Sequence, residues 1–503
     1  MSVTETSVLD RVDGSLRETP SRWSLAPARV LVAVSAAFVL VALTLAGRKG
    51  FWVDEGFTAA FVRQPWSDFL HQLTKIDLNM ASYDIVAKIW VALFGTGEVA
   101  MRSLSIAFVV ATFPVAHRLF LRIYGKKTAT FAVVLLAINP WTTVVAITVR
   151  PYAMLLFISA LSSVLLLRAL ESKSRSRWVG YALLCVVGLY THLTMAFVFA
   201  AQGVFALLRK RRIDRDLLLA GAIVALGAIP TVLWIAPTDT LDWIGGPSIR
   251  GAWTAATIAA GGTVAFVITA AVLATAVRPL FRSLARAHYD DRALPVVMLV
   301  VPAILMLAVT PIQPLVDVDL YLTLFLLPLA GVLAMAVFRF RPSQSLAVIG
   351  VLVAAYGGTL IWTVAPAPGY ASQGWKEAAA ILRRDSRPDE AIAFPNSYAR
   401  IPVELYSRHD GKVGFAARPV LPSAGWGALS PYGLDRNNRL RLERGPDHLR
   451  MQLAGVNRLW VVGYVGSTNP GGDMGDVDQA ARAKGLRLDR EYRFGDTLVR
   501  HYS

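Results

Sequence analysis

The stretch RVLVAVSAAFVLVALTLAGRKGFWVDEGFT, residues 29–58, decides the fold of this chain. It begins with an apolar run, near residues 29–47, that is long enough to cross the hydrocarbon core of a bilayer as a helix. Two adjacent carboxylates, Asp54 and Glu55, follow that run almost directly and lie among aromatic residues. A membrane helix that leads into paired acids would hold a carboxylate at the lipid–water boundary, where a membrane enzyme needs a base.

The rest of the chain is equally apolar. Of its 503 residues, 55% are hydrophobic and 17% are charged, and the mean hydropathy is +0.49. A soluble protein cannot bury so large an apolar fraction, so the composition indicates a polytopic membrane protein. The net charge of +17 would suit a nucleic-acid partner. Much of that excess lies in short loops between apolar runs, however, where basic residues set membrane orientation and contact anionic lipid, so we expect no nucleic-acid partner.

The single cysteine, Cys185, lies inside an apolar run. One cysteine excludes an intramolecular disulfide and a cysteine-based metal site, so we expect a small buried hydrophobe. The first 27 residues are polar, and no small-residue cleavage site follows the first apolar run. We therefore expect that run to be a retained anchor behind a cytoplasmic tail, residues 1–28.

Windows of about 20 apolar residues predict about eleven transmembrane helices within residues 29–366. They lie near residues 29–47, 103–121, 128–148, 152–170, 178–191, 194–208, 216–236, 252–277, 293–311, 319–338 and 344–365. Arginine and lysine cluster in alternate loops, near residues 122–127, 173–177, 209–215, 278–292 and 339–341. The positive-inside rule places these loops in the cytoplasm, and it places the 48–102 loop and everything after residue 366 outside.

Both outer segments carry structure of their own. In the 48–102 loop, apolar residues at helical spacing in Ala59–Ile76 and Ser82–Leu93 predict two amphipathic helices at the membrane interface. A helical hairpin above the bundle is the alternative. Residues 367–503 are charged and contain no run long enough to span. A small α/β domain is predicted there from a helix at Trp375–Arg384, strands at Ala391–Phe394 and Leu459–Val465, a helix through Gln479–Lys484 and a hairpin at Arg490–His501.

Asp54 and Glu55 are the first candidate catalytic residues. Adjacent residues point in different directions on a helix or strand, so the two carboxylates are not expected to face each other across a substrate. One can face the reacting centre while the other binds the acceptor, a metal ion or a supporting arginine. The alternative is an exposed turn that caps the next helix.

Further polar residues lie on the same predicted side. Asp77, Asn79 and Tyr83 stand between the two interfacial helices, where Asp77 and Asn79 can instead act as helix caps. Arg150, at the outer edge of two spans, runs against the orientation rule. An anionic partner such as a lipid phosphate would explain it, and extension of the side chain to the headgroups is the alternative.

Four other residues join this set. Arg102 can bind a phosphate or pair with Glu98 at helical spacing. His192, at the outer end of the fifth span, is either a structural residue or a functional one. Asp319 and Tyr321 enter the tenth span from outside, and acids in that position are costly enough to indicate a partner.

Several motifs are absent from the sequence. It contains no Walker loop, no dinucleotide fingerprint, no HExxH and no CxxC pair. ATP-driven transport and zinc-dependent hydrolysis therefore lack support. A transporter that uses Asp317 and Asp319 as coupling acids ranks last, because those residues lie near the mouth of a span and not at its middle.

Taken in order, these residues resemble the GT-C glycosyltransferases, and among them the bacterial relatives of the protein O-mannosyltransferases and the lipid A aminoarabinose transferases, of the actinobacterial type. The segments that carry the resemblance are Trp52–Glu55, Asn79–Tyr83, Leu93–Gly95 with Glu98, Arg102–Ser105, Arg150–Ala153, Tyr190–His192 and Gly374–Ala379. The resemblance covers most of the chain. No one motif is specific, but their order and their common outward side are.

The sequence departs from many relatives at three places. Asn79-Met80-Ala81 stands where many carry His-Pro-Pro, Asp84 replaces a second aromatic residue, and Leu320-Tyr321 lacks the arginine of an Arg-Tyr pair. These changes affect the acceptor pocket and one donor-phosphate contact. They motivate the alternative function, a catalytically inactive scaffold or polyprenyl-lipid carrier in cell-envelope assembly.

The resemblance implies an α-helical polytopic fold and an inverting glycosyltransferase in a bacterial plasma membrane. The donor would be a polyprenyl-phosphate sugar, mannose or arabinose-like, and the acceptor an envelope glycan, lipoglycan or protein on the outer face. Asp54 would be the base, with Glu55 in support. The donor phosphate would be bound by Arg150, Tyr152, His192 and Arg102, and the acceptor by Asp77, Asn79, Tyr83 and Tyr321. No nucleotide cofactor is expected, and a divalent metal ion near the phosphate stays open.

Overall fold

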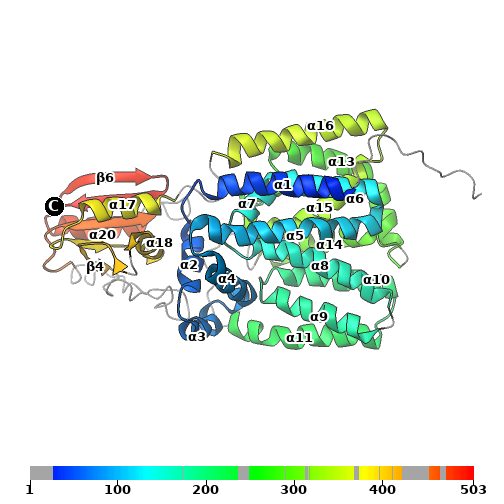
Figure 1. Cartoon of the computed structure of the whole chain (residues 1–503), viewed down its shortest axis with the longest axis horizontal. Helices are drawn as coiled ribbons and strands as arrows, with labels where there is room; N and C mark the ends of the chain where they lie inside the picture. The colour runs from blue at the N-terminus through cyan, green and yellow to red at the C-terminus, as the bar shows by residue number, and fades with distance from the viewer. Residues whose placement is uncertain are drawn as a thin grey trace, which may run out of the picture.

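The computed structural model describes residues 27–172, 174–235, 248–288, 290–311, 315, 318–366, 373–395, 397–409, 412–421, 453–464 and 472–503. It is a bundle of long helices with a mixed α/β region at one end (Figure 1). Nearly all of the predicted cytoplasmic tail, residues 1–28, lies outside the described residues.

The bundle contains every segment that was predicted to span. Its helices are α1 (Pro27–Ala46), α5 (Glu98–Tyr124), α6 (Lys126–Ile138), α7 (Pro140–Ala146), α8 (Tyr152–Leu170), α9 (Arg175–Leu189), α10 (Met195–Lys210), α11 (Arg215–Ile235), α12 (Ile249–Ala259), α13 (Thr263–Ala285), α14 (Ala293–Val309), η3 (Asp319–Phe325), α15 (Leu326–Val337), α16 (Pro342–Thr359) and η4 (Leu360–Val364).

Fewer of these helices meet the length of a membrane span than the sequence predicts. In the described part of the chain, seven are long and apolar enough, or eight if the bent pair α6 and α7 is one span. Three further predicted spans, α9, α10 and α14, have 15, 16 and 17 residues. The predicted class, a helical polytopic membrane protein, is confirmed, while the number of eleven spans stays a prediction.

Two predicted spans have different shapes from those expected. The predicted span 252–277 divides into α12 and α13, because Gly261 and Gly262 take left-handed φ values of 88° and 113° that side chains rarely adopt. The predicted span 128–148 bends by 64° between α6 and α7. There the side chain of Asn139 accepts a hydrogen bond from the N–H of Trp141 and caps α7, and Pro140 begins that helix.

The basic connections gather at the end of the bundle opposite the α/β region (Figure 1). Arg122, at the end of α5, forms ion pairs with Glu171 after α8 (2.9 Å) and Asp291 before α14 (2.8 Å). Arg209, at the end of α10, also pairs with Asp291 (3.6 Å). Four predicted cytoplasmic loops therefore share one end of the molecule, as the alternating charge pattern requires.

The first long loop forms a layer between the bundle and the α/β region (Figure 1). It contains α2 (Val53–Val62), α3 (Trp66–Ile76), the short η1 (Leu78–Met80) and α4 (Ala81–Phe94). The helix predicted at 59–76 is therefore two helices. Pro65 precedes α3 and disfavours a helical residue before it, which separates the two.

The C-terminal region is the small α/β unit that the sequence predicts. Its elements are α17 (Trp375–Asp385), β1 (Ala391–Ala393), α18 (Ser397–Ser407), β2 (Arg408–His409), β3 (Lys412–Val413), β4 (Arg418–Leu421), β5 (Leu459–Tyr464), α20 (Gly472–Ala483), β6 (Leu488–Phe494) and β7 (Thr497–Tyr502). The sheet order is β4-β1-β5-β7-β6, with β4, β1 and β5 parallel and the last two strands antiparallel. Helices cover both faces of β5, which explains its unbroken apolar run.

Candidate active site

Helix α2 places Asp54 and Glu55 in its first turn. Negative side chains are favoured there by the positive end of the helix dipole. Because successive residues point in different directions around a helix, the two carboxylates meet different neighbours. Glu55 is 1% exposed, whereas 43% of the Asp54 side chain remains accessible. Only Asp54 is therefore open to a ligand.

Glu55 is fully committed to contacts within the protein. Its Oε2 accepts a hydrogen bond from Arg102 Nη2 at 2.6 Å, and its Oε1 accepts one from Arg102 Nε at 3.1 Å. The same carboxylate accepts the backbone N–H of Val149 at 2.8 Å and that of Trp52 at 3.3 Å. Glu55 therefore joins α2 to α5 and to the turn that precedes Arg150.

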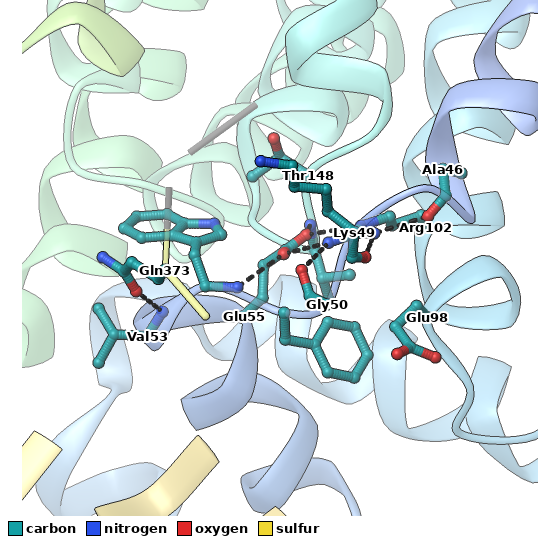
Figure 2. A network of polar contacts seen from close by, with 12 residues as sticks. Ala46, Lys49, Gly50, Val53, Glu55, Glu98, Arg102, Thr148 and Gln373 are labelled. Atoms are coloured by element: carbon teal, nitrogen blue, oxygen red, sulfur yellow. Dashed lines mark hydrogen bonds and ion pairs between the residues drawn. The ribbon is translucent and has the colours of Figure 1, made fainter. Parts of the chain in front are cut away.

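Arg102 has no N–H group left for a phosphate. Besides its two bonds to Glu55, Nη1 donates to the carbonyl oxygens of Ala46 (2.6 Å) and Lys49 (2.7 Å), and Nη2 donates to that of Gly50 (3.0 Å), as Figure 2 shows. These contacts use all five donors of the guanidinium group. The alternative partner predicted from helical spacing, Glu98, instead pairs with Lys376 and Tyr406 of the C-terminal region.

Arg150 lies beside Asp54 and is much less committed. Its Nε is 3.8 Å from Asp54 Oδ2, beyond hydrogen-bond distance, and its Nη1 donates to Thr58 Oγ1 at 3.3 Å. The residue is 9% exposed, and in the described part of the chain its Nε has no hydrogen-bond partner. A buried guanidinium group with donors to spare is suited to an anionic ligand.

The electrostatics of this pair favour a cation beside a base. Loss of hydration raises the pKa of Asp54 above its usual value; Arg150 opposes this shift and Glu55 adds to it. Burial by itself would lower the pKa of Arg150, but Asp54 and the neighbouring acids raise it overall. Arg150 therefore stays charged, while Asp54 is a stronger base than a solvated aspartate.

Three aromatic rings from separate segments meet close to this pair. The ring of His192 lies 5.2 Å from that of Tyr152 and 5.1 Å from that of Tyr321, centroid to centroid. They come from the start of α8, the α9–α10 turn and η3. The charge of Arg150 also reaches the imidazole. Tyr321, predicted to contact the acceptor, therefore lies with the predicted donor residues.

His192 is held as a neutral hydrogen-bond donor. The backbone N–H of Thr194 donates to its Nδ1 at 3.2 Å, which places the ring proton on Nε2. Burial, with a further contribution from Arg150, lowers the pKa of His192 to about 3. The ring therefore stays neutral at ordinary pH and presents an Nε2–H group.

Asp77 and Asp84 form a second acidic group at the same end of the bundle. Their carboxyl groups hydrogen-bond each other, and burial raises the pKa of Asp77 to about 6 and that of Asp84 well above its usual value. The pair therefore holds a proton, and the charge of Arg150 reaches both acids. The departure from the family pattern at Asp84 thus supplies the partner of Asp77.

Asn79 and Tyr83 lie on the same segment but differ in their surroundings. Asn79 is 8% exposed, and within the described ranges its Oδ1 accepts no hydrogen bond. Tyr83 is fully buried and directs its hydroxyl toward Ser105. The N–H of Ser82 donates to the carbonyl of Tyr190 at 2.9 Å, which joins this segment to the turn that carries His192.

The structure gathers Asp54, Arg150, Tyr152, His192 and Tyr321 into one site, with Asp77 and Asn79 close by. Glu55 and Arg102 stand behind that site, and Tyr83 is buried beside it.

Sequence reasoning missed two contributors. Thr58 contacts Arg150 from the face of α2 that carries Asp54, and its spacing of four residues from Asp54 was an available signal. Thr194 fixes the tautomer of His192, and no sequence pattern indicates this contact.

The described residues contain no group of three or more His, Cys, Asp or Glu side chains that could hold a metal ion.

Comparison with known proteins gives one family and one fold. Residues 82–234 match the family described as dolichyl-phosphate-mannose-protein mannosyltransferase. That segment runs from α4 to α11 and contains Arg150, Tyr152 and His192, but not Asp54. No curated protein sequence matches the chain.

Several solved structures have a similar fold. ArnT from Cupriavidus metallidurans bound to undecaprenyl phosphate has a TM-score of 0.59 at 13% identity, with 94% of this chain and 97% of that one covered. Its apo form gives 0.61 at 14%, with 95% and 98% covered. The archaeal oligosaccharyltransferase AglB from Archaeoglobus fulgidus gives 0.50 at 12%, with 95% and 74% covered. At these identities the structures show the fold, and with the family match they confirm the resemblance predicted from the sequence.

Proposed function

We propose that this chain is a GT-C membrane glycosyltransferase dependent on a polyprenyl-phosphate sugar. It transfers a mannose- or arabinose-like sugar to a cell-envelope acceptor and inverts the anomeric carbon. The observation that carries the proposal is the 3.8 Å approach of Arg150 to Asp54. Such a transfer needs a base for the acceptor and a cation for the leaving phosphate. A carboxylate of raised pKa beside a buried arginine with an unused N–H donor supplies both groups.

The proposed reaction is a single displacement. Asp54 takes the proton of the acceptor hydroxyl as its oxygen bonds to the anomeric carbon. The bond between that carbon and the phosphate oxygen breaks on the opposite face, and the polyprenyl phosphate leaves with the electron pair. Arg150 and the Nε2–H of His192 stabilise the negative charge on the leaving phosphate by hydrogen bonds. The proton on Asp54 is then lost to water.

Donor binding would also activate the base. Arg150 is the group that opposes the rise in the pKa of Asp54. When a phosphate neutralises Arg150, that opposition weakens and the pKa of Asp54 rises further. The carboxylate therefore becomes a better proton acceptor once the donor is in place.

The remaining site residues would bind the sugars or position the reactive pair. We assign Tyr152 and Tyr321 to the donor wall around His192, and Asp77 and Asn79 to sugar hydroxyl groups, because Asn79 is buried with an unsatisfied carbonyl oxygen. A hydroxyl group of a bound sugar would donate a hydrogen bond to the Asn79 oxygen. Glu55 and Arg102 would position α2 and take no part in phosphate binding.

We place the site on the outer face of a bacterial plasma membrane. The basic connections, gathered at the other end of the bundle, would then lie in the cytoplasm. Residues 29–366 would be the membrane module and residues 367–503 an outer domain. A structure of ArnT holds undecaprenyl phosphate, which supports a donor of that chemical class here.

The test is Asp54→Asn in purified protein. The assay measures release of undecaprenyl phosphate from undecaprenyl phosphate that carries mannose or arabinose, with envelope membranes as the acceptor. Loss of a general base predicts a fall of about 10²–10⁴-fold. Asp68→Asn, on the exposed face of α3, is the matched control and retains activity. Near-wild-type turnover by Asp54→Asn overturns the base assignment, and lipid binding by the wild type with no turnover of either sugar favours the carrier function.

A further inference from the structure

A side chain of the C-terminal region caps the helix that carries Asp54. Gln373 Oε1 accepts a hydrogen bond from the backbone N–H of Val53 at 2.7 Å (Figure 2). Val53 is the first residue of α2, so its N–H has no acceptor within the helix. Gln373 therefore satisfies the N–H group of the residue that precedes Asp54, from 320 residues away in the sequence.

A second residue of the C-terminal region holds the segment just before α2. The hydroxyl of Tyr406 accepts the backbone N–H of Phe51 and donates to Glu98 Oε1 at 3.2 Å. Glu98 is the first residue of α5, and Lys376 pairs with the same oxygen at 3.4 Å. Tyr406 thus links the entrance of α2 to the start of a spanning helix.

The backbone of α2 is also in close contact with α18. A Cβ atom on Gly56 would lie 2.9 Å from Pro402 Cβ, and one on Gly50 would lie 2.9 Å from the hydroxyl oxygen of Tyr406. Because glycine has no side chain at either position, side chains of α18 can pack directly against the backbone of α2 and of the segment before it. Figure 1 shows α18 against α2 at this boundary.

Gln373 is itself rigidly held. Trp375, which is 1% exposed, donates its Nε1–H to the same Oε1 at 2.8 Å. Gln373 pairs with Gly495 at the β6–β7 turn, and the N–H of Gly374 donates to Thr497 Oγ1 at 3.1 Å. The position of Oε1 is therefore set by the sheet of the C-terminal region.

We propose that Gln373 and Tyr406 are positioning residues through which the C-terminal region sets the first turn of α2 and aims Asp54 at the reacting centre. This inference rests on the proposed function. Asp54 is the residue after Val53, so a rotation of that turn moves its carboxylate relative to Arg150. A misplacement of about 1 Å at a reacting group can cost about 100-fold in rate.

The test compares Gln373→Leu with Gln373→Glu. Leucine removes the acceptor of the Val53 N–H, whereas glutamate keeps an acceptor oxygen at the same reach. We expect Gln373→Leu to lower kcat about tenfold or more, with the donor KM within about twofold of wild type, because Arg150 and His192 are untouched. Gln373→Glu restores most of kcat. Turnover is expressed per site that binds undecaprenyl phosphate, so misfolded protein does not count.

Tyr406→Phe gives an independent reading, because it keeps the ring and loses only the hydroxyl. It should lower kcat in the same manner and shift the acid limb of the kcat–pH profile, which reports the ionisation of Asp54. Arg384→Ala, on the exposed side of α17, is the control and keeps wild-type constants.

Wild-type kcat per binding site in both Gln373→Leu and Tyr406→Phe, or a loss confined to the donor KM, overturns the inference. If Asp54→Asn is inactive under those conditions, the proposed function stands and only the positioning role fails. If Asp54→Asn is fully active, the proposed function fails whatever the Gln373 variants do.

Discussion

Replacement of Glu55 by glutamine separates a positioning role from a catalytic one. The Glu55 carboxylate is 1% exposed and accepts four hydrogen bonds, two of them from Arg102. Glutamine fills the same volume but has one acceptor oxygen, and its NH₂ group would face N–H donors. The variant therefore leaves the Arg102 charge buried and unpaired, and at least one backbone N–H without its acceptor.

The expected loss of stability is large. Removal of one partner of a buried ion pair costs about 3–5 kcal/mol. With an unfolding entropy of about 2.1 cal/mol/K per residue, this corresponds to a drop in Tm of about 3–5 °C for a chain of this length. The drop is larger if spanning helices persist on unfolding, because less entropy is then released. Turnover should fall as well, since Glu55 also holds the N–H of Val149 beside Arg150.

Thermal unfolding in detergent, followed by tryptophan fluorescence, measures this change. Glu171→Gln is the matched control, because its pair with Arg122 lies at the surface with 57% of the Glu171 side chain exposed. A surface pair contributes about 0–1 kcal/mol, so the control should shift Tm by no more than about 1 °C. An unchanged Tm in Glu55→Gln would refute the anchoring role of Glu55. If turnover were also lost completely, Glu55 would be a catalytic residue instead.

Two further outcomes follow from the same geometry. Arg150→Gln should weaken binding of undecaprenyl phosphate by about 10–150-fold, the value of one charged hydrogen bond, as measured by lipid titration in native mass spectrometry; unchanged affinity would contradict the phosphate assignment. His192 has a folded pKa lowered to about 3, so the unfolded state alone binds its proton below the usual value of 6.5, and stability is lost as pH falls from there. His192→Gln should remove that component, and an equally steep fall of Tm between pH 7 and pH 5 in both proteins would contradict it.

The fold was predictable where it depends on hydrophobic periodicity and composition. Apolar runs located the bundle helices, and the change in composition after Pro366 located the α/β region. The misplaced boundaries have local causes. Glycines with left-handed φ values divide the predicted span 252–277, and Pro65 divides the predicted interfacial helix, so backbone geometry interrupted runs that hydropathy treats as continuous.

The candidate site was predictable as a set of residues but not as a set of roles. Arg102 and Arg150 look alike in the sequence, since each lies at the outer boundary of a predicted span. The structure distinguishes them by their hydrogen bonds. All five N–H donors of Arg102 bind protein oxygens, whereas Arg150 Nε has no hydrogen-bond partner in the described part of the chain. Contacts from distant segments, such as Gln373 on Val53, leave no periodic signal at all.

The adjacency of Asp54 and Glu55 has a physical explanation in these contacts. Glu55 accepts the N–H of Val149, whose neighbour is Arg150, while its own neighbour is Asp54. One buried carboxylate therefore holds the backbone on both sides of the 3.8 Å gap between Asp54, the proposed base, and Arg150, the proposed phosphate-binding cation. A glutamate directly after Asp54 in the helix suits this role. Successive helical residues point in different directions, so Glu55 faces the supporting contacts while Asp54 faces the ligand. The pair therefore consists of one exposed carboxylate, the proposed base, and one buried anchor.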